Sequence, residues 1–276
     1  MSLPLTLLFG GVVGLSLGMT GGGGAIFAVP MLVYGLQVPA RESIAISLAA
    51  VGATAMVGFV RRLKEGGVEV VTGLLFAVAG MVGAPAGTWI ASRIPDRVLL
   101  LLFAGLMLVV AIKMWMQATK RSRPKLLNDL DCKEKPNPNP TCQRDDQGRL
   151  LLSSRCAMLL MVLGVATGIL SGMFGVGGGF IIVPALVLFS GMSMHRAIGT
   201  SLLVVALVSG SGLISQWTAG TALNWTVTGL FVAGGLVGLF LGQSIASKMK
   251  AETLQRVFAV AIILVACFVV ARNVSA

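Results

Sequence analysis

Two clusters of glycine could bind an anion through main-chain N–H groups. The first runs from Gly21 to Gly24 and is followed by Pro30, and the second runs from Gly175 to Gly179 and is followed by Pro184. Glycine permits the backbone conformations and close approaches that an interrupted helix requires. A helix that restarts after an interruption presents unpaired N–H groups and a partial positive charge. The clusters therefore predict two helix ends that attract an anion.

Hydroxyl side chains near the clusters could add hydrogen-bond donors. A hydroxyl can donate to an anion without the desolvation cost of a buried charge. Each hydroxyl could equally well donate to the main-chain carbonyl four residues earlier in its own helix. The candidates are Thr20, Ser47, Thr54, Ser171, Thr200, Ser201, Ser209 and Ser211. The site that we expect, with helices restarting at about Gly24 and Gly178, consists of Thr20, Gly21, Gly22, Gly23, Gly24, Ser47, Gly175, Gly177, Gly178, Gly179, Thr200 and Ser201.

Titratable residues offer little for catalysis. His195 is the only histidine, and all ten acidic residues lie in loops or at the ends of expected helices. The expected helices therefore lack the residues for a nucleophile with its general base, and they also lack the residues for a metal cluster. We therefore expect no enzyme, no cofactor and no metal. His195 and Arg41 hold equivalent places after the two clusters, where a gating or proton-linked role and an ordinary interfacial role are both open.

The composition indicates that membrane-spanning helices position these residues. Of the 276 residues, 56% are hydrophobic and 11% are charged, which is typical of a polytopic membrane protein. The apolar runs are rich in glycine and do not alternate with polar residues, which favours helices over barrel strands. They lie near residues 44–60, 70–91, 98–118, 157–173, 197–215, 226–246 and 254–271.

The chain contains one unit twice. Adding 154 to a residue number aligns Gly18 with Gly172, Pro30 with Pro184 and Ser47 with Ser201, and an offset of 155 aligns later glycines, such as Gly80 with Gly235. We expect a first transmembrane repeat at 1–119, a linker at 120–154 and a second repeat at 155–276. Other glycines in small-xxx-small spacing, Gly83 to Gly87 and Gly234 to Gly242, are expected to serve helix packing.

The two repeats are expected to be inverted. A helix over residues 3–36 would be about 50 Å long, too long for one crossing, so each glycine cluster should turn a helical hairpin that precedes three transmembrane helices. Each half then crosses an odd number of times, which inverts the second. The fold class that we predict is an all-α polytopic membrane protein with two inverted repeats.

Charge sets the expected orientation. Nine of the 21 Lys and Arg residues fall between Lys120 and Arg155, so the net charge of +11 marks a cytoplasmic linker rather than a nucleic-acid-binding surface. Both termini are then expected outside. The inverted arrangement also groups Arg61, Arg62, Lys64, Arg196, Lys248, Lys250 and Arg256 on the linker side, and Arg41, Arg93, Arg97 and Arg272 on the other.

The duplicated "GGGGAIFAVPMLV" and "GVGGGFIIVPALV", with "MHRAIGTSLLVV" after the second, resemble the TauE/SafE family of sulfite and organosulfonate exporters. The resemblance covers both halves but not the linker. The first half departs from the last motif, since Arg41, Ala45 and Ile46 stand where the second half has His195, Gly199 and Thr200.

This resemblance implies a multi-pass carrier of the inner membrane that exports small sulfur oxyanions, such as sulfite or C2 sulfonates including sulfoacetate, by alternating access. The open alternatives are an anion channel and a carrier of another small anion. The expected partners are the anion and the lipid bilayer, with a homodimer left open and no nucleic acid.

Overall fold

The structure is a computed structural model that describes residues 3–121, 154–190, 192, 194–221, 223–246 and 251–274. The described residues form helices and contain no strand. The long helices are α1 (Leu3–Thr20), α3 (Ala40–Lys64), α4 (Val70–Arg93), α5 (Asp96–Arg121), α6 (Ser154–Phe174), α8 (Met194–Thr218), α9 (Trp225–Ala246) and α10 (Ala251–Val274). Within the described residues, six helices are long and apolar enough to cross a membrane: α1, α3, α4, α6, α8 and α9. The all-α polytopic fold is thereby confirmed.

Local sequence explains the bounds of α3, the helix that carries Ser47. It begins after Pro39, which fixes an extended backbone before the helix, and has Glu42 in its first turn. Its last turn contains Arg61, Arg62 and Lys64, and Gly66 then adopts a φ of 70°. Basic residues followed by a left-handed glycine are favourable at a helix C-terminus.

Glycines allow helices of opposite halves to pack very closely. Helix α1 lies against α9, and α4 lies against α6. On α1, an added Cβ at Gly14 would overlap the carbonyl oxygen of Gly235, and on α6 a Cβ at Gly168 would overlap that of Gly80. Gly83, Gly87, Gly238 and Gly242 make the same kind of backbone contact. Their expected packing role is confirmed.

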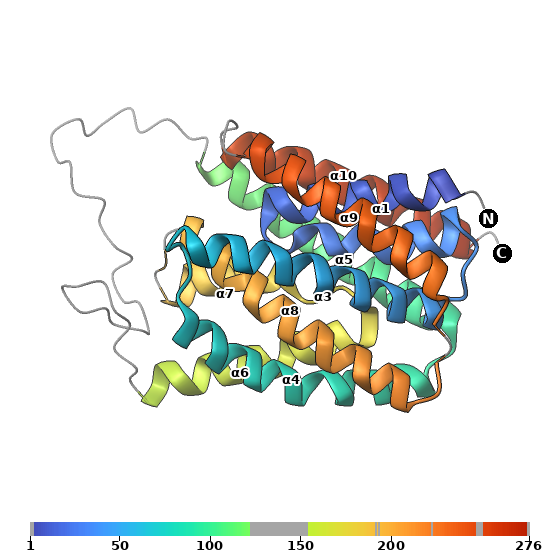
Figure 1. The fold of residues 1–276 in the computed structure, drawn as a ribbon, viewed down its shortest axis with the longest axis horizontal. Helices are drawn as coiled ribbons and strands as arrows, with labels where there is room; N and C mark the ends of the chain where they lie inside the picture. Colours follow the sequence, from blue (N-terminus) through green and yellow to red (C-terminus); the bar gives the residue numbers. More distant parts are fainter. Residues whose placement is uncertain are drawn as a thin grey trace, which may run out of the picture.

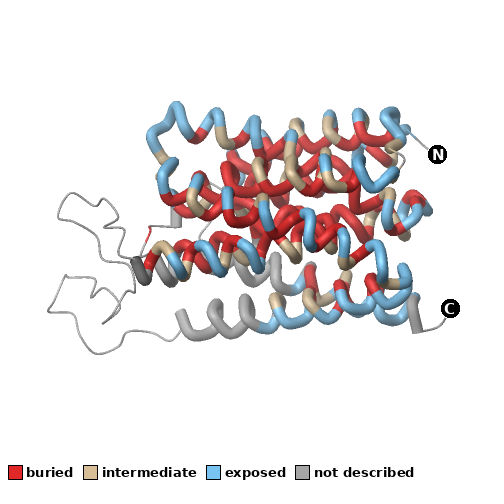
Figure 2. Tube along the Cα trace, turned by 90° about the horizontal axis from the view of Figure 1, so that it is seen from below, coloured by how far each residue is buried: buried red, intermediate tan, exposed pale blue. Residues whose placement is uncertain are grey.

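The central helices come one from each half. Helix α3 packs against α8 at the most buried part of the bundle, and α5 packs against α10. Figure 2 shows the buried residues gathered in the middle, with exposed residues along the outer helices. This interior, built from both halves, holds the two glycine clusters.

The ends of the helices separate into two groups. Both termini lie at one end of the bundle, whereas α5 ends and α6 begins at the other (Figure 1). Arg41 pairs with Asp96 at the first end, with Nε 3.3 Å from the carboxylate, and Arg196 Nη1 lies 3.8 Å from Glu69 at the second. Inverted symmetry and the division at 1–119, 120–154 and 155–276 stay predictions.

Candidate functional site

The first glycine break, residues 21–22, interrupts the chain where the sequence predicts. Helix α1 ends at Thr20, and Gly21 and Gly22 take φ values of 75° and 153°, which favour glycine. The restart differs from expectation. It is not a regular α-helix but a 3₁₀ segment η1 (Gly23–Phe27), a short α2 (Ala28–Pro30) and a π-turn η2 (Met31–Gly35).

Thr20 contributes to this irregular restart. Pro30 supplies no N–H to the turn, but proline alone does not account for the irregularity, because the equivalent Pro184 lies inside a regular α-helix over Gly179–Ser190. Thr20 closes the break from within, because its Oγ1 donates to the Ser16 carbonyl over 2.7 Å and accepts from the Gly23 N–H over 3.0 Å. The Gly23 amide is thus already bonded by the protein.

The second glycine break, residues 175–178, leads into a regular helix. Helix α6 ends at Phe174, and Gly175, Gly177 and Gly178 have φ values of 70°, 67° and 70°. Helix α7 (Gly179–Ser190) follows. Ile181 and Ile182 donate to the carbonyl of Gly178 at 3.0 and 3.2 Å. An N–H in the first turn, such as that of Gly179, has no acceptor within its own helix.

The two breaks meet inside the bundle. A Cβ placed on Gly22 would lie 2.5 Å from the Cα of Gly179, so only a glycine pair permits this approach. Each break is also held by a serine of the other half. Ser47 Oγ donates to the carbonyl of Gly175 over 2.6 Å, and Ser201 Oγ donates to that of Gly21 over 2.6 Å.

Two other members of the expected group, Thr200 and Arg41, bond elsewhere. The Thr200 hydroxyl accepts from the N–H of Glu69 over 3.0 Å, at the turn before α4. Arg41 Nη2 donates to the carbonyl of Ser92 over 3.1 Å, at one end of the bundle. The backbone of His195 lies in the first turn of α8, and its side chain lies outside the described residues. The structure thus brings together the two breaks with Thr20, Ser47 and Ser201.

Most of these hydroxyls are already engaged. Thr54 bonds the carbonyl of Ala50, and Ser211 bonds that of Met81, at 2.7 and 2.9 Å. A hydroxyl has one proton, so Ser47 and Ser201 have none left for an anion while they hold the glycine carbonyls. They serve here as supports of the two breaks.

Ser171 and Ser209 differ from the other hydroxyls, because both are fully buried and neither has a hydrogen-bond partner. Ser171 lies one turn before the second break, and Ser209 Oγ lies 2.9 Å from where a Cβ of Gly177 would be. The buried amide Nε2 of Gln243, on α9 beside the end of α1, is also unpartnered. Both serines are among the hydroxyl candidates from the sequence but lie outside the expected site. Gln243 was not predicted, although its polarity within an apolar run is a signal that could have found it.

The described residues contain no cluster of His, Cys, Asp and Glu that could hold a metal ion. At the second break the interior of the bundle offers neutral donors, namely the hydroxyls of Ser171 and Ser209 and the N–H groups at the start of α7. Such donors suit a small anion with several acceptor oxygens.

Comparison with known proteins adds an independent observation. The profile of the sulfite exporter TauE/SafE family matches residues 6–269. A "Probable membrane transporter protein" of Xylella fastidiosa is 35% identical over 277 residues, which cover 99% of this chain and 96% of that protein. The "Probable membrane transporter protein YdhB" of Bacillus subtilis is 27% identical over 88% of this chain and 90% of its own length. No solved structure matches.

Proposed function

Because this chain belongs to the sulfite exporter TauE/SafE family and is a multi-pass membrane transporter, we propose that it exports a small sulfur oxyanion across the cell inner membrane. Sulfite and C2 organosulfonates such as sulfoacetate are the substrates that we put forward. The linker is cytoplasmic in this proposal and both termini are external, in keeping with the concentration of basic residues in the linker.

The observation that carries the proposal is the pair of buried, unpartnered hydroxyls at the second glycine break. A buried hydroxyl without a partner costs about 1–3 kcal/mol. An oxyanion next to Ser171 and Ser209 would accept from both and remove that cost. The N-terminus of α7 begins at Gly179, directly after the same break, and its dipole favours negative charge.

The site is proposed to be asymmetric. At the first break, the Thr20 hydroxyl accepts the hydrogen bond of the Gly23 N–H, and the restart is a five-residue 3₁₀ segment. Its dipole is weaker than that of the twelve-residue α7. We therefore assign the anion to the second break, with Ser47 holding the Gly175 carbonyl from the other half.

The contact between the two halves supports alternating access as the proposed mechanism. The contact of Gly22 with Gly179 closes the centre of the bundle, and rocking of one half against the other would open it. Export of an anion is favoured by an inside-negative potential, by about 2.3 kcal/mol per charge per 100 mV, so no coupled ion is required. A gating role for Arg41 and His195 stays a hypothesis. Arg41 lies in the first turn of α3, and His195 lies in the first turn of α8.

Binding to the purified protein tests the proposal. Sulfite, sulfoacetate, sulfate, thiosulfate, taurine and an amine should be compared for wild type, Ser171→Ala and Ser209→Ala. Each variant should bind the sulfur oxyanion about 10- to 150-fold more weakly, since a lost hydrogen bond to a charged group contributes about 1.5–3 kcal/mol. Thr218→Ala, which removes an exposed hydroxyl at the end of α8, should bind as wild type does.

Unchanged affinity in both serine variants would contradict the assigned site. Tight binding of the amine, or no preference for sulfur oxyanions, would contradict the substrate class. In proteoliposomes, saturable flux with counterflow is expected of a carrier, whereas unitary conductance steps would replace the carrier with a channel.

A further inference from the structure

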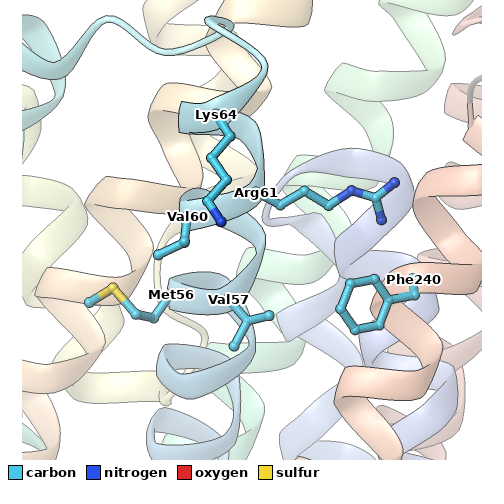
Figure 3. Close-up of a pocket in the computed structure, with 6 residues that line it drawn as sticks. All are labelled: Met56, Val57, Val60, Arg61, Lys64 and Phe240. Carbon is cyan, nitrogen blue, oxygen red and sulfur yellow. The ribbon is translucent and has the colours of Figure 1, made fainter.

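A pocket of about 410 Å³ lies on the outer surface between the C-terminal part of α3 and helix α9. It is lined by Met56, Val57, Val60, Arg61, Lys64 and Phe240 (Figure 3). The four apolar side chains are between 37% and 45% exposed. Helices α3 and α9 both have the length and hydropathy of membrane spans. The apolar wall of the pocket therefore faces lipid.

Two cations close one end of this pocket. The Cζ atom of Arg61 lies 5.6 Å from the ring centroid of Phe240, and its Nε lies 3.4 Å from a carboxylate oxygen of Glu65. Lys64, one turn further along α3, makes no ion pair with an acid among the described residues. In Figure 3 the Lys64 amine points back along the helix toward Val60, over the apolar part of the pocket.

The usual roles of basic residues at a helix end explain only part of this arrangement. Cations at a helix C-terminus offset its dipole, and basic residues on the cytoplasmic side fix topology. Neither role requires an aromatic ring beneath Arg61 or a pocket below Lys64. The contact with Glu65 is an exposed i,i+4 pair, which is weak and can be exchanged for a stronger anion.

The corresponding positions of the other half lack these features. The 154-residue offset aligns Arg61 with Ser215 and Lys64 with Thr218, and the 155-residue offset aligns Phe240 with Pro85. No charged or aromatic member of the pocket is repeated. The combination of cations and apolar wall therefore belongs to one end of the protein only.

From this combination we propose that the pocket binds an anionic phospholipid of the leaflet at the C-terminal end of α3. The phosphate lies between Arg61 and Lys64, and an acyl chain follows Met56, Val57 and Phe240. An anionic headgroup complements the two cations, and the chain covers apolar surface that no described residue covers. Since α3 belongs to the first half and α9 to the second, the lipid bridges the halves.

Lipid retention measures this binding directly. The full-length protein is reconstituted in bilayers that contain equal amounts of phosphatidylglycerol and phosphatidylcholine, and native mass spectrometry identifies the lipids that remain bound after detergent release. Wild type should retain phosphatidylglycerol preferentially. In R61Q/K64Q that preference should fall about fivefold for each cation removed, from about 1 kcal/mol per basic residue at an anionic surface.

Matched variants separate this pocket from general electrostatics. R61K/K64R keeps both charges and should keep the preference. R97Q removes a cation beside Asp96, at the opposite end of the bundle, and should keep it too. An unchanged preference in R61Q/K64Q, or an equal loss in R97Q, would overturn the proposal.

Two further experiments test the acyl-chain contact and a simpler ligand. F240S leaves the charges in place but removes the aromatic wall, so lipid retention should fall in this variant as well, and full retention would count against an acyl-chain site. Inorganic phosphate at the lipid concentration should not displace the bound lipid. Displacement by phosphate alone would make this a free phosphate site and would overturn the lipid assignment.

Discussion

The hydroxyl oxygen of Ser47 lies 2.6 Å from the carbonyl oxygen of Gly175, so a core helix of the first half holds the glycine break of the second. The reciprocal bond joins Ser201 to Gly21 with the same length. A buried main-chain carbonyl that loses its donor stays unpaired in an apolar interior. The two breaks therefore depend on side chains from opposite halves.

Removal of either serine hydroxyl should destabilise the protein modestly. Ser47→Ala and Ser201→Ala each leave one buried carbonyl unpaired, and we expect a loss of about 1 kcal/mol in unfolding free energy. Thermal unfolding in detergent measures it, with Thr218→Ala as a control for an exposed hydroxyl. Thr at position 47 or 201 should restore part of the stability, and an Ala variant as stable as wild type would show that the bond contributes nothing.

The glycine contact at the centre should be intolerant of a single methyl group. Gly179→Ala places a Cβ against the backbone of Gly22, which is not a flexible side chain and cannot rotate away. We expect anion binding and flux to be lost at normal membrane expression. Gly210→Ala on α8 adds the same methyl group where no other atom lies within 4 Å. Wild-type flux in Gly179→Ala would be incompatible with the proposed closure.

The glycines between α1 and α9, and those between α4 and α6, should set the stability of the whole bundle. In Gly14→Ala and Gly168→Ala the new methyl group overlaps a main-chain carbonyl of the facing helix, and overpacking of this kind costs about 1–3 kcal/mol. Gly229→Ala on α9 meets no atom within 4 Å and should be neutral or slightly stabilising, because alanine favours helix. Urea unfolding in mixed micelles compares them. If all three variants were equally stable, the close glycine contacts would not determine the stability of the bundle.

Labelling should locate the linker in the cytoplasm and the C-terminus outside. Alkaline phosphatase fused after Ala276 should be active, and a cysteine placed in residues 122–153 should react only after the membrane is permeabilised. The competing outcome has a structural basis. Cys156 forms a disulfide in the structure, and disulfides are rare in a reducing cytosol. An external linker would reverse the orientation and the proposed leaflet of the lipid pocket.

Much of the fold follows from patterns that are local or repeated. Apolar length predicts the spans, and the 154-residue offset predicts that Ser47 and Ser201 play matching parts, as their reciprocal bonds show. Glycine clusters predict interruption because few other residues accept the backbone of Gly21 or Gly175. These features depend on residue type and spacing alone.

The hydrogen-bond partner of each hydroxyl could not be predicted from residue type and spacing. Hydroxyls of equal type have three different uses: Thr20 caps its own break, Thr200 bonds the turn before α4, and Ser209 bonds nothing. Which use applies depends on contacts between residues far apart in sequence, such as the 131 positions between Glu69 and Thr200. The sequence likewise predicted equal helix restarts, whereas the first restart is a 3₁₀ segment closed by the Thr20 hydroxyl and the second is the regular helix α7.

The packing of α1 against α9 has a consequence for biogenesis. Helix α1 leaves the ribosome well before α9, yet the main-chain carbonyls that its glycines contact belong to α9. Until α9 is synthesised, that glycine surface has no complementary helix, so the nascent first half must wait at the insertion machinery or beneath a chaperone. A truncated chain that ends in the linker should for this reason be degraded rather than accumulate as a stable half-transporter.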